Sequence, residues 1–261
     1  MDKIVNIIDV QRHPIGDLNS YAVHCKEELL KNSILILNKF LTKEALLELQ
    51  HEANILQKNA FYCSQNHNVL LAEKNQLLKN NHPCNVEVVS DKGCVPHDLI
   101  PAHSHLRAIY ASEIFKSFVQ SVLSVDTIYP YADSLSSINY NYYQKSQQLG
   151  WHFDNASFAI ALLIQSSVLG GKFQYVIDAR NVEKDTVNVP LIDAVLENNY
   201  PVEEIQIEEG TLVLFNGRNY LHRVTPVASS KPRILVTLNY NLEKDLELTE
   251  NARLTFFGRL F

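Results

Sequence analysis

The sequence is short of cysteine and glycine, and no segment of it is a long uninterrupted apolar run. It contains 4 cysteines and 8 glycines in 261 residues. No two cysteines stand in a CxxC spacing, which argues against a dense disulfide framework and against a cysteine-based metal cluster. We therefore expect reduced thiols, as in a cytoplasmic protein. No segment approaches the roughly 20 consecutive apolar residues of a membrane-spanning helix.

An excess of positive charge is also missing. The chain has 23 Lys and Arg against 29 Asp and Glu, a net charge of −6, and its basic residues are scattered. This argues against a nucleic-acid partner. The N-terminal stretch MDKIVNIIDVQRH is interrupted by polar residues every few positions and does not resemble a signal peptide. The oligomeric state stays open, with a homodimer as one alternative.

The sequence pattern changes once along the chain. Hydrophobic residues make up 46% and charged residues 20%, as in ordinary globular proteins. We expect residues 1–261 to form a single domain, with a mainly helical part over 1–125 and a β-rich part over 126–261. Helical periodicity and capping signals predict helices over 19–31, over 43–58 with Thr42 as N-cap, and over 104–123, and a short apolar strand over 33–37.

After residue 126, short alternating segments separated by turn signals indicate strands. The candidates are 136–143, 158–165, 172–177, 202–207, 211–215, 220–227 and 233–241, with a short helix from Pro190 through Asn198. Helices followed by many short strands suggest a closed or sandwiched antiparallel β-unit with helices packed outside.

The segment GWHFD, residues 150–154, joins an imidazole and a carboxylate to the buried apolar run 156–164. Residues i and i+2 of a strand point to the same face, so His152 and Asp154 can both face an interior. Two imidazoles and one carboxylate form the metal-binding triad of non-haem Fe(II) oxygenases. His222, in LHRVTP, is the candidate for the second imidazole.

Arg233 follows His222 at the start of the next apolar strand. A 2-oxoglutarate co-substrate that chelates the iron leaves one carboxylate free, and arginine suits that group as a permanently charged, bidentate partner. We expect one hairpin, turning near residues 229–232, to bring Arg233 and His222 to the same interior.

Each of these signals is weak alone, because His-x-Asp is common by chance and His152 could be a structural histidine. The pair His103 and His105 shows how common such spacings are, and we interpret it as a surface or capping feature. The combination of His-x-Asp, a distant His, a following Arg and β-texture favours a metal site.

The stretch NYYQKSQQLGWHFDNASFAIALLIQ, with GGKFQYV, GTLVLFNGRNYLHRVTPV and RILVTLNYN, resembles the Fe(II)/2-oxoglutarate oxygenase superfamily. More narrowly, it resembles the branch of free-amino-acid radical halogenases and their lysine hydroxylase relatives. The similarity runs from about Ile34 to the C-terminus and is most specific from Asn141 to Val227. It implies a double-stranded β-helix (jelly-roll or cupin-like) core with N-terminal α-helices outside. It also implies Fe(II) as cofactor and 2-oxoglutarate and O2 as co-substrates.

That branch divides at one position. Its halogenases replace the metal-binding carboxylate by a small residue, which frees a coordination site for chloride. This chain has Asp154 there. The resemblance therefore implies a hydroxylase, and Asp154→Gly is the change expected to open the site to halogenation.

Two polar faces are expected to line the interior. Counting by two from Arg233 reaches Thr237 and Asn239, which contact either the substrate or each other. The resemblance assigns Asn141 and Tyr143 to the 2-oxoglutarate pocket, although Tyr143 could equally be core packing. Further substrate candidates are Asn155, Asp133 and Trp151, the last of which could equally be structural.

The resemblance implies a small-molecule substrate, with a free amino acid expected and lysine favoured. Asn155 stands where a lysine-specific relative should have an acidic residue, and the segment 82–85, HPCN, lacks an expected arginine. Asp98 and Arg107 are further possible contacts. Ornithine, arginine or a polar neutral amino acid stay open. The alternatives to this function are a protein or peptide side-chain hydroxylase, a degenerate sensor and a non-catalytic cupin-like metal-binding protein.

Overall fold

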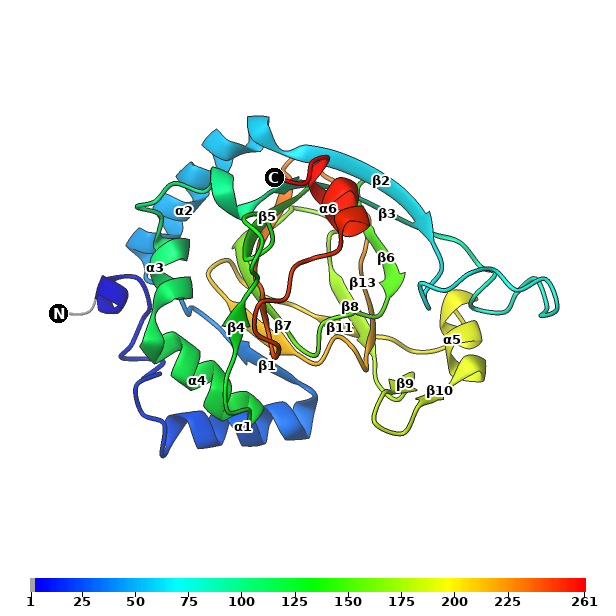
Figure 1. Cartoon of the computed structure of the whole chain (residues 1–261), viewed down its shortest axis with the longest axis horizontal. Coiled ribbons are helices and arrows are strands. Elements are labelled where there is room, and N and C mark those ends of the chain that lie inside the picture. Colours follow the sequence, from blue (N-terminus) through cyan, green and yellow to red (C-terminus); the bar gives the residue numbers. More distant parts are fainter. Residues whose placement is uncertain (1–2) are drawn as a thin grey trace.

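Two antiparallel sheets face each other in the computed structural model, which describes residues 3–261. Their strands are arranged in a ring in Figure 1. The seven-stranded sheet has the order β1-β12-β7-β14-β5-β3-β2, and the four-stranded sheet the order β11-β8-β13-β6. Their bounds are β1 Ile34–Leu37, β2 Phe61–His67, β3 Val88–Val95, β5 Ile138–Tyr143, β6 Leu149–His152, β7 Ala159–Gln165, β8 Phe173–Val176, β11 Glu203–Ile205, β12 Leu212–Phe215, β13 Leu221–Val224 and β14 Arg233–Leu238.

Two further ladders are small. They pair β4 Tyr129–Pro130 with β15 Tyr240–Asn241, and β9 Arg180–Asn181 with β10 Thr186–Val187. The mainly β architecture with flanking helices confirms the predicted fold class.

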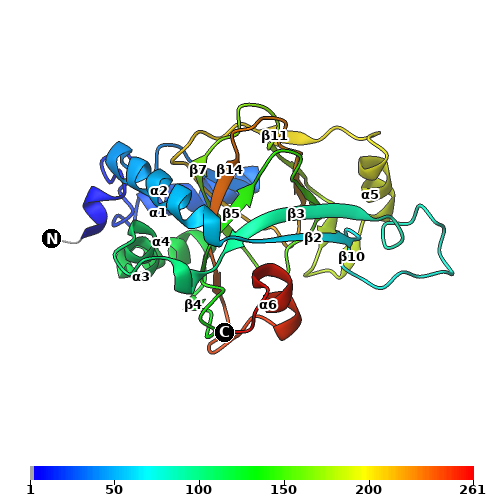
Figure 2. The ribbon, with the colours of Figure 1, turned by 90° about the horizontal axis from the view of Figure 1, so that it is seen from above.

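The helices lie on the outside of the sheets. Helices α1 to α4 gather on one side of the strands, α5 lies on the opposite side, and α6 lies beside β2 and β3 (Figures 1 and 2). No helix within residues 3–261 is long and apolar enough to cross a membrane. The bounds of the helices are α1 Tyr21–Asn32, α2 Lys43–Leu56, α3 His105–Ala111, α4 Glu113–Leu123, α5 Val189–Leu196 and α6 Glu250–Phe257, with short 3-10 turns at Lys3–Asn6, Gln57–Asn59 and His97–Leu99.

Strand β5 contributes side chains to both faces of its sheet. All six of its residues are buried, and they alternate between the helices and the interior. Tyr140 and Tyr142 point to α2, where their hydroxyls donate to Glu52 Oε1 and to the Ala53 carbonyl, each at 2.8 Å. Asn141 and Tyr143 therefore face the space between the sheets, as the period of two predicts.

The single helix predicted over 104–123 is wrong, because the chain forms two helices there. Ser112 has extended backbone angles (φ −69°, ψ 122°) and its side chain accepts a hydrogen bond from the Phe115 amide. A serine that caps a new helix competes with continuation of the old one. Thr42, by contrast, caps α2 as predicted, accepting from the Ala45 amide.

The boundary near residue 125 does not separate helices from sheet. Strands β1, β2 and β3 come from the N-terminal part and belong to the seven-stranded sheet. Of these, β2 and β3 were not predicted, because FYCSQNH and VVSDKGCV lack a regular apolar alternation. Strand β6 and helix α6 were also missed.

The predicted hairpin between His222 and Arg233 is also wrong. Strand β13 belongs to the four-stranded sheet, whereas β14 lies between β7 and β5 in the seven-stranded sheet. The connection between β13 and β14 therefore crosses from one sheet to the other. Because the two sheets face each other, both residues still line one interior cavity.

Candidate metal centre

His152 and His222 lie directly opposite each other on the adjacent antiparallel strands β6 and β13. Their ring centroids are 4.1 Å apart. Nδ1 of His152 donates to the Gly150 carbonyl at 2.8 Å, and Nδ1 of His222 donates to the Tyr220 carbonyl at 2.9 Å. Since a carbonyl can only accept, each Nδ1 carries the proton and each Nε2 keeps a lone pair for a metal.

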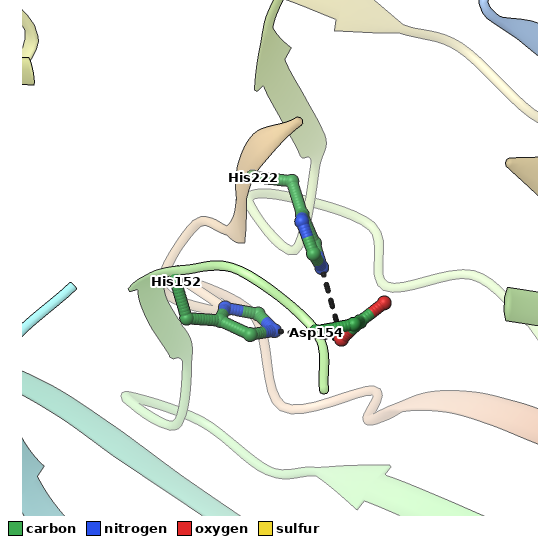
Figure 3. Close-up of side chains that lie close together, drawn as sticks. All are labelled: His152, Asp154 and His222. Carbon is green, nitrogen blue, oxygen red and sulfur yellow. Dashed lines mark ion pairs between the residues drawn. The ribbon is translucent and has the colours of Figure 1, made fainter. Parts of the chain in front are cut away.

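Asp154 completes the triad from the loop after β6. Both Nε2 atoms lie 3.5 Å from its Oδ1, as Figure 3 shows. One ligand atom from each of the three residues lies within 4.8 Å of the others. The structure thus brings together the three residues that the sequence proposed as metal ligands.

Two neighbours hold Asp154 in place. Its amide donates to the Gly217 carbonyl at 2.9 Å. The Arg180 guanidinium lies 4.1 Å from the Phe153 ring centroid and donates to the carbonyls of Asp154, at 3.3 Å, and Arg218, at 2.7 Å. Neither Gly217 nor Arg180 was identified from the sequence, because Gly217 lies in a turn and Arg180 in the two-residue strand β9, and their spatial relation to Asp154 depends on the fold.

The electrostatics of the triad favour metal binding at neutral pH. Burial alone raises the pKa of Asp154, but the neighbouring His222, together with His152, holds that pKa well below its usual range. Burial, followed by the proximity of His222, lowers the pKa of His152. A carboxylate and a neutral imidazole are the protonation states that ligate a cation.

The triad opens into a cavity of about 380 Å³ between the two sheets. Such a volume suits a small molecule. The predicted residues that line it are Asn141, Tyr143, Asn155, Arg233, Thr237 and Asn239. They come mostly from β5 and β14, where Arg233 pairs with Tyr143, and Thr237 with Asn139.

Arg233 is buried, and one of its donors is unused within the described residues. It is 3% exposed, and its Nη1 forms no hydrogen bond within residues 3–261. The guanidinium carbon lies 5.8 Å from the Tyr143 ring centroid. Burial lowers the pKa of Arg233, yet guanidinium stays charged in proteins. A buried cation with an unused donor, facing a metal triad across a cavity, fits the free carboxylate of a chelating 2-oxo acid.

The other substrate candidates fall into different environments. Asn239 donates to the Ser136 carbonyl at 2.6 Å and to Asn139 Oδ1 at 3.0 Å, so its hydrogen bonds go to these residues in place of the bond with Thr237 considered from the sequence. Thr237 and Asn155 line the cavity, and no side-chain hydrogen bond is seen for either within the described chain.

Trp151 and Asp133, in contrast to expectation, do not line the cavity. Trp151 packs in a separate apolar cluster, where the Arg223 guanidinium stacks 4.6 Å from its ring. It follows Gly150 and precedes His152, so the alternation of the strand turns it outward. Asp133 accepts hydrogen bonds from the amides of Leu135 and Ser136 and so caps a turn.

Asp98 and Arg107 also lie outside the cavity lining. Asp98 forms an ion pair with Arg259 at 2.7 Å, and Arg107 donates to the Ile100 carbonyl at 2.9 Å. The pair at residues 103 and 105 contributes a surface contact, since Nε2 of His105 lies 2.8 Å from Glu48 Oε2.

Lys92 is a functional candidate that the sequence reasoning missed. It lies on β3, between Ser90 and Cys94, and all three residues line the cavity. Recognising residues 88–95 as a strand would have placed Ser90, Lys92 and Cys94 on one face. The sequence pattern did not indicate a strand here, because this face is polar.

Solved structures with a similar fold include an oxygenase-family protein and two prolyl hydroxylases. A 2OG-Fe(II) oxygenase family protein from Burkholderia pseudomallei is 12% identical, with 88% of this chain and 94% of that chain covered and a TM-score of 0.55. A prolyl hydroxylase from Trichoplax adhaerens, solved with a hypoxia-inducible-factor peptide, is 17% identical (90% and 94% covered, TM-score 0.54). A Pseudomonas putida prolyl-4-hydroxylase is 10% identical (83% and 96% covered, TM-score 0.52). At such identities the likeness shows the fold.

The fold is the double-stranded β-helix of these oxygenase structures, as the sequence resemblance predicted, and the triad lies in its interior. A family model described as HalD: Halogenase D matches residues 19–255. The chain therefore belongs to the Halogenase D family. No curated protein matches the sequence.

The expected cofactors agree with this result, whereas the expectation about halogenation does not. Fe(II), with 2-oxoglutarate and O2 as co-substrates, is the cofactor set that the fold and the triad support. The expectation that halogenation is disfavoured conflicts with the name of the family. The conflict centres on Asp154, whose Oδ1 lies 3.5 Å from Nε2 of both imidazoles.

Proposed function

We propose that this chain is an Fe(II)- and 2-oxoglutarate-dependent dioxygenase that hydroxylates an unactivated C–H bond of a free amino acid, with lysine favoured. The observation that carries the proposal is the intact His152, Asp154 and His222 triad in a cavity that also contains the unpartnered Arg233. The reaction converts substrate, 2-oxoglutarate and O2 into hydroxylated product, succinate and CO2.

Each side chain has a distinct role in this proposal. The imidazoles of His152 and His222 and the carboxylate of Asp154 would hold the iron, which would supply the oxidising chemistry. Arg233 holds the free carboxylate of 2-oxoglutarate, and Asn141 and Tyr143 line the same pocket. The cavity between the two sheets would confine oxidation to the bound substrate.

A small-molecule substrate is supported by the size and position of the cavity. Its volume is about 380 Å³, and Phe256 and Phe257 of α6 form part of its lining. Asn155 and Thr237 stay candidates for substrate contacts. The favoured place of action is the cytoplasm, where the four free cysteines would stay reduced.

Halogenation is the second candidate, and the family name favours it. Chloride needs a coordination position, and Asp154 fills the position that a small residue would leave open. We therefore place hydroxylation first, with residues 1–261 acting as one oxygenase domain.

The test is succinate release from anaerobically reconstituted protein given Fe(II), 2-oxoglutarate, chloride and then O2. The panel is the twenty free amino acids and ornithine, with Asp154→Ala and Arg233→Ala as controls. We expect one amino acid to stimulate succinate release and to gain one oxygen atom, with both variants inactive. A chlorinated product would establish the halogenase instead. Uncoupled turnover without stimulation would redirect the search to peptides, and no turnover despite bound iron would favour the cupin-like metal-binding protein.

A further inference from the structure

Lys92 places a second cationic side chain in the cavity. Its Nζ donates to Asn141 Oδ1 at 2.7 Å and lies 5.6 Å from the Phe256 ring centroid. Asn141 belongs to β5, and Phe256 belongs to α6. The ammonium group therefore lies where the seven-stranded sheet meets the C-terminal helix, which packs against β2 and β3 (Figure 2).

This ammonium group has no anionic partner. No carboxylate within residues 3–261 forms an ion pair with Lys92, and Asn141 supplies a neutral amide oxygen. Burial by itself lowers the pKa of Lys92, but the surrounding groups, Tyr143 first and Asp154 among them, leave it raised above its usual value. Lys92 is therefore a cation at neutral pH. A partly buried cation without a counter-ion is costly unless a ligand supplies one.

The charges of the proposed reactants balance one another without Lys92. The two positive charges of Fe(II) and the one of Arg233 balance Asp154 and the two carboxylates of 2-oxoglutarate. One of those carboxylates belongs to the 2-oxo acid end, which would chelate the metal. The other would accept a hydrogen bond from the free Nη1 of Arg233. Among the described residues that line the cavity, Lys92 is then the one charged side chain left without an opposite charge.

We propose that Lys92 binds an acidic group of the primary substrate, so that the substrate class is a small carboxylate and its acidic end lies beneath α6. This assignment rests on the proposed function, since it takes Arg233 as the anchor of 2-oxoglutarate. It makes Lys92 a specificity-determining residue. Asn141, whose amide oxygen accepts from Nζ, holds the ammonium group in the cavity before the substrate arrives.

The experiment is anaerobic isothermal titration of the Fe(II) and 2-oxoglutarate complex with the twenty amino acids and ornithine, each paired with its carboxamide. The proteins are the wild type, Lys92→Met, Lys92→Arg and the control Lys145→Met, which removes an exposed lysine that has no hydrogen-bond partner within residues 3–261. The affinity of each protein for 2-oxoglutarate is measured first.

We expect at least one amino acid to bind the wild type and Lys145→Met about tenfold or more tightly than its carboxamide, as for a charge-assisted hydrogen bond. Lys92→Met should bind acid and amide equally, Lys92→Arg should keep the preference, and the affinity for 2-oxoglutarate should stay within about twofold.

Three results would overturn the assignment. The first is an acid preference that survives in Lys92→Met. The second is that Lys92→Met loses affinity for 2-oxoglutarate and not for the amino acid. The third is that the wild type shows no acid preference for any member of the panel. The assay needs no turnover. If the Lys92 pattern holds while no amino acid stimulates succinate release, the proposed function fails and the assignment stands. If turnover occurs without acid preference, the proposed function stands and the assignment of Lys92 fails.

Discussion

Gly217 lies so close to Asp154 that a Cβ atom built at residue 217 would come within 1.8 Å of Asp154 Oδ2. The two residues are also joined by the hydrogen bond from the Asp154 amide to the Gly217 carbonyl, at 2.9 Å. Glycine at 217 therefore provides the space that the Asp154 carboxylate occupies. This matters for the choice between hydroxylation and halogenation, because a chain with a small residue at 154 would not need that space.

Gly217→Ala should lower the affinity for Fe(II) by about tenfold or more, because the added methyl group displaces the carboxylate. The same change in an Asp154→Gly background should cost little, since the clash is then absent. The measurement is a double-mutant cycle of Fe(II) affinity. Equal losses in both backgrounds would show that residue 217 acts on the backbone alone and not on the carboxylate.

Arg233→Met should weaken 2-oxoglutarate binding by roughly 10- to 100-fold, since a hydrogen bond to a charged group contributes about 1.5–3 kcal/mol. Fe(II) affinity should change little, because Arg233 lies across the cavity from the triad. Anaerobic titration with 2-oxoglutarate measures the effect. The matched control is Arg223→Met, whose guanidinium stacks on Trp151 outside the cavity. A similar loss in the control would point to general destabilisation.

Arg180→Met should lower Fe(II) affinity by about 10-fold, in the range found for groups that orient metal ligands. The guanidinium bridges the carbonyls of Asp154 and Arg218 and so fixes the loop that carries the carboxylate. Arg218→Met is the control, because it removes an exposed charge nearby but keeps the carbonyl. If both variants lose Fe(II) equally, the effect is one of charge and not of positioning.

Asp133→Asn should destabilise the protein by about 1–3 kcal/mol at neutral pH. Its carboxylate accepts from Leu135, Ser136 and Leu248, and these bonds outweigh burial to hold its pKa below the ordinary 3.8. A lowered folded-state pKa means that this stabilisation is complete above 3.8 and is lost as pH falls through the folded value.

Chemical denaturation at several pH values measures this effect. The difference between wild type and Asp133→Asn should shrink towards acid pH, whereas Asp126→Asn, at an exposed position without a resolved hydrogen bond in the described chain, should differ little at any pH. A pH-independent difference would mean that the loss of shape, and not of charge, is responsible.

The sequence was informative where periodicity and chemistry coincide. The apolar strands β7, β12 and β14, the cap at Thr42 and the inward face of β5 were all predictable, because each depends on neighbours within a few residues. The polar strands β2 and β3 were not, since their inward face contributes Lys92, Ser90 and Cys94 to a cavity and not to an apolar core.

The sequence by itself predicted the mainly β fold, the three residues that the structure brings together as a candidate metal triad, and an interior arginine, because side-chain chemistry and short-range periodicity are local properties. Only the tertiary structure decided that β13 and β14 lie in facing sheets, and that Gly217 leaves room for Asp154. These depend on which distant strands pair and how loops meet, and such pairings depend on packing over the whole chain, which no local pattern encodes.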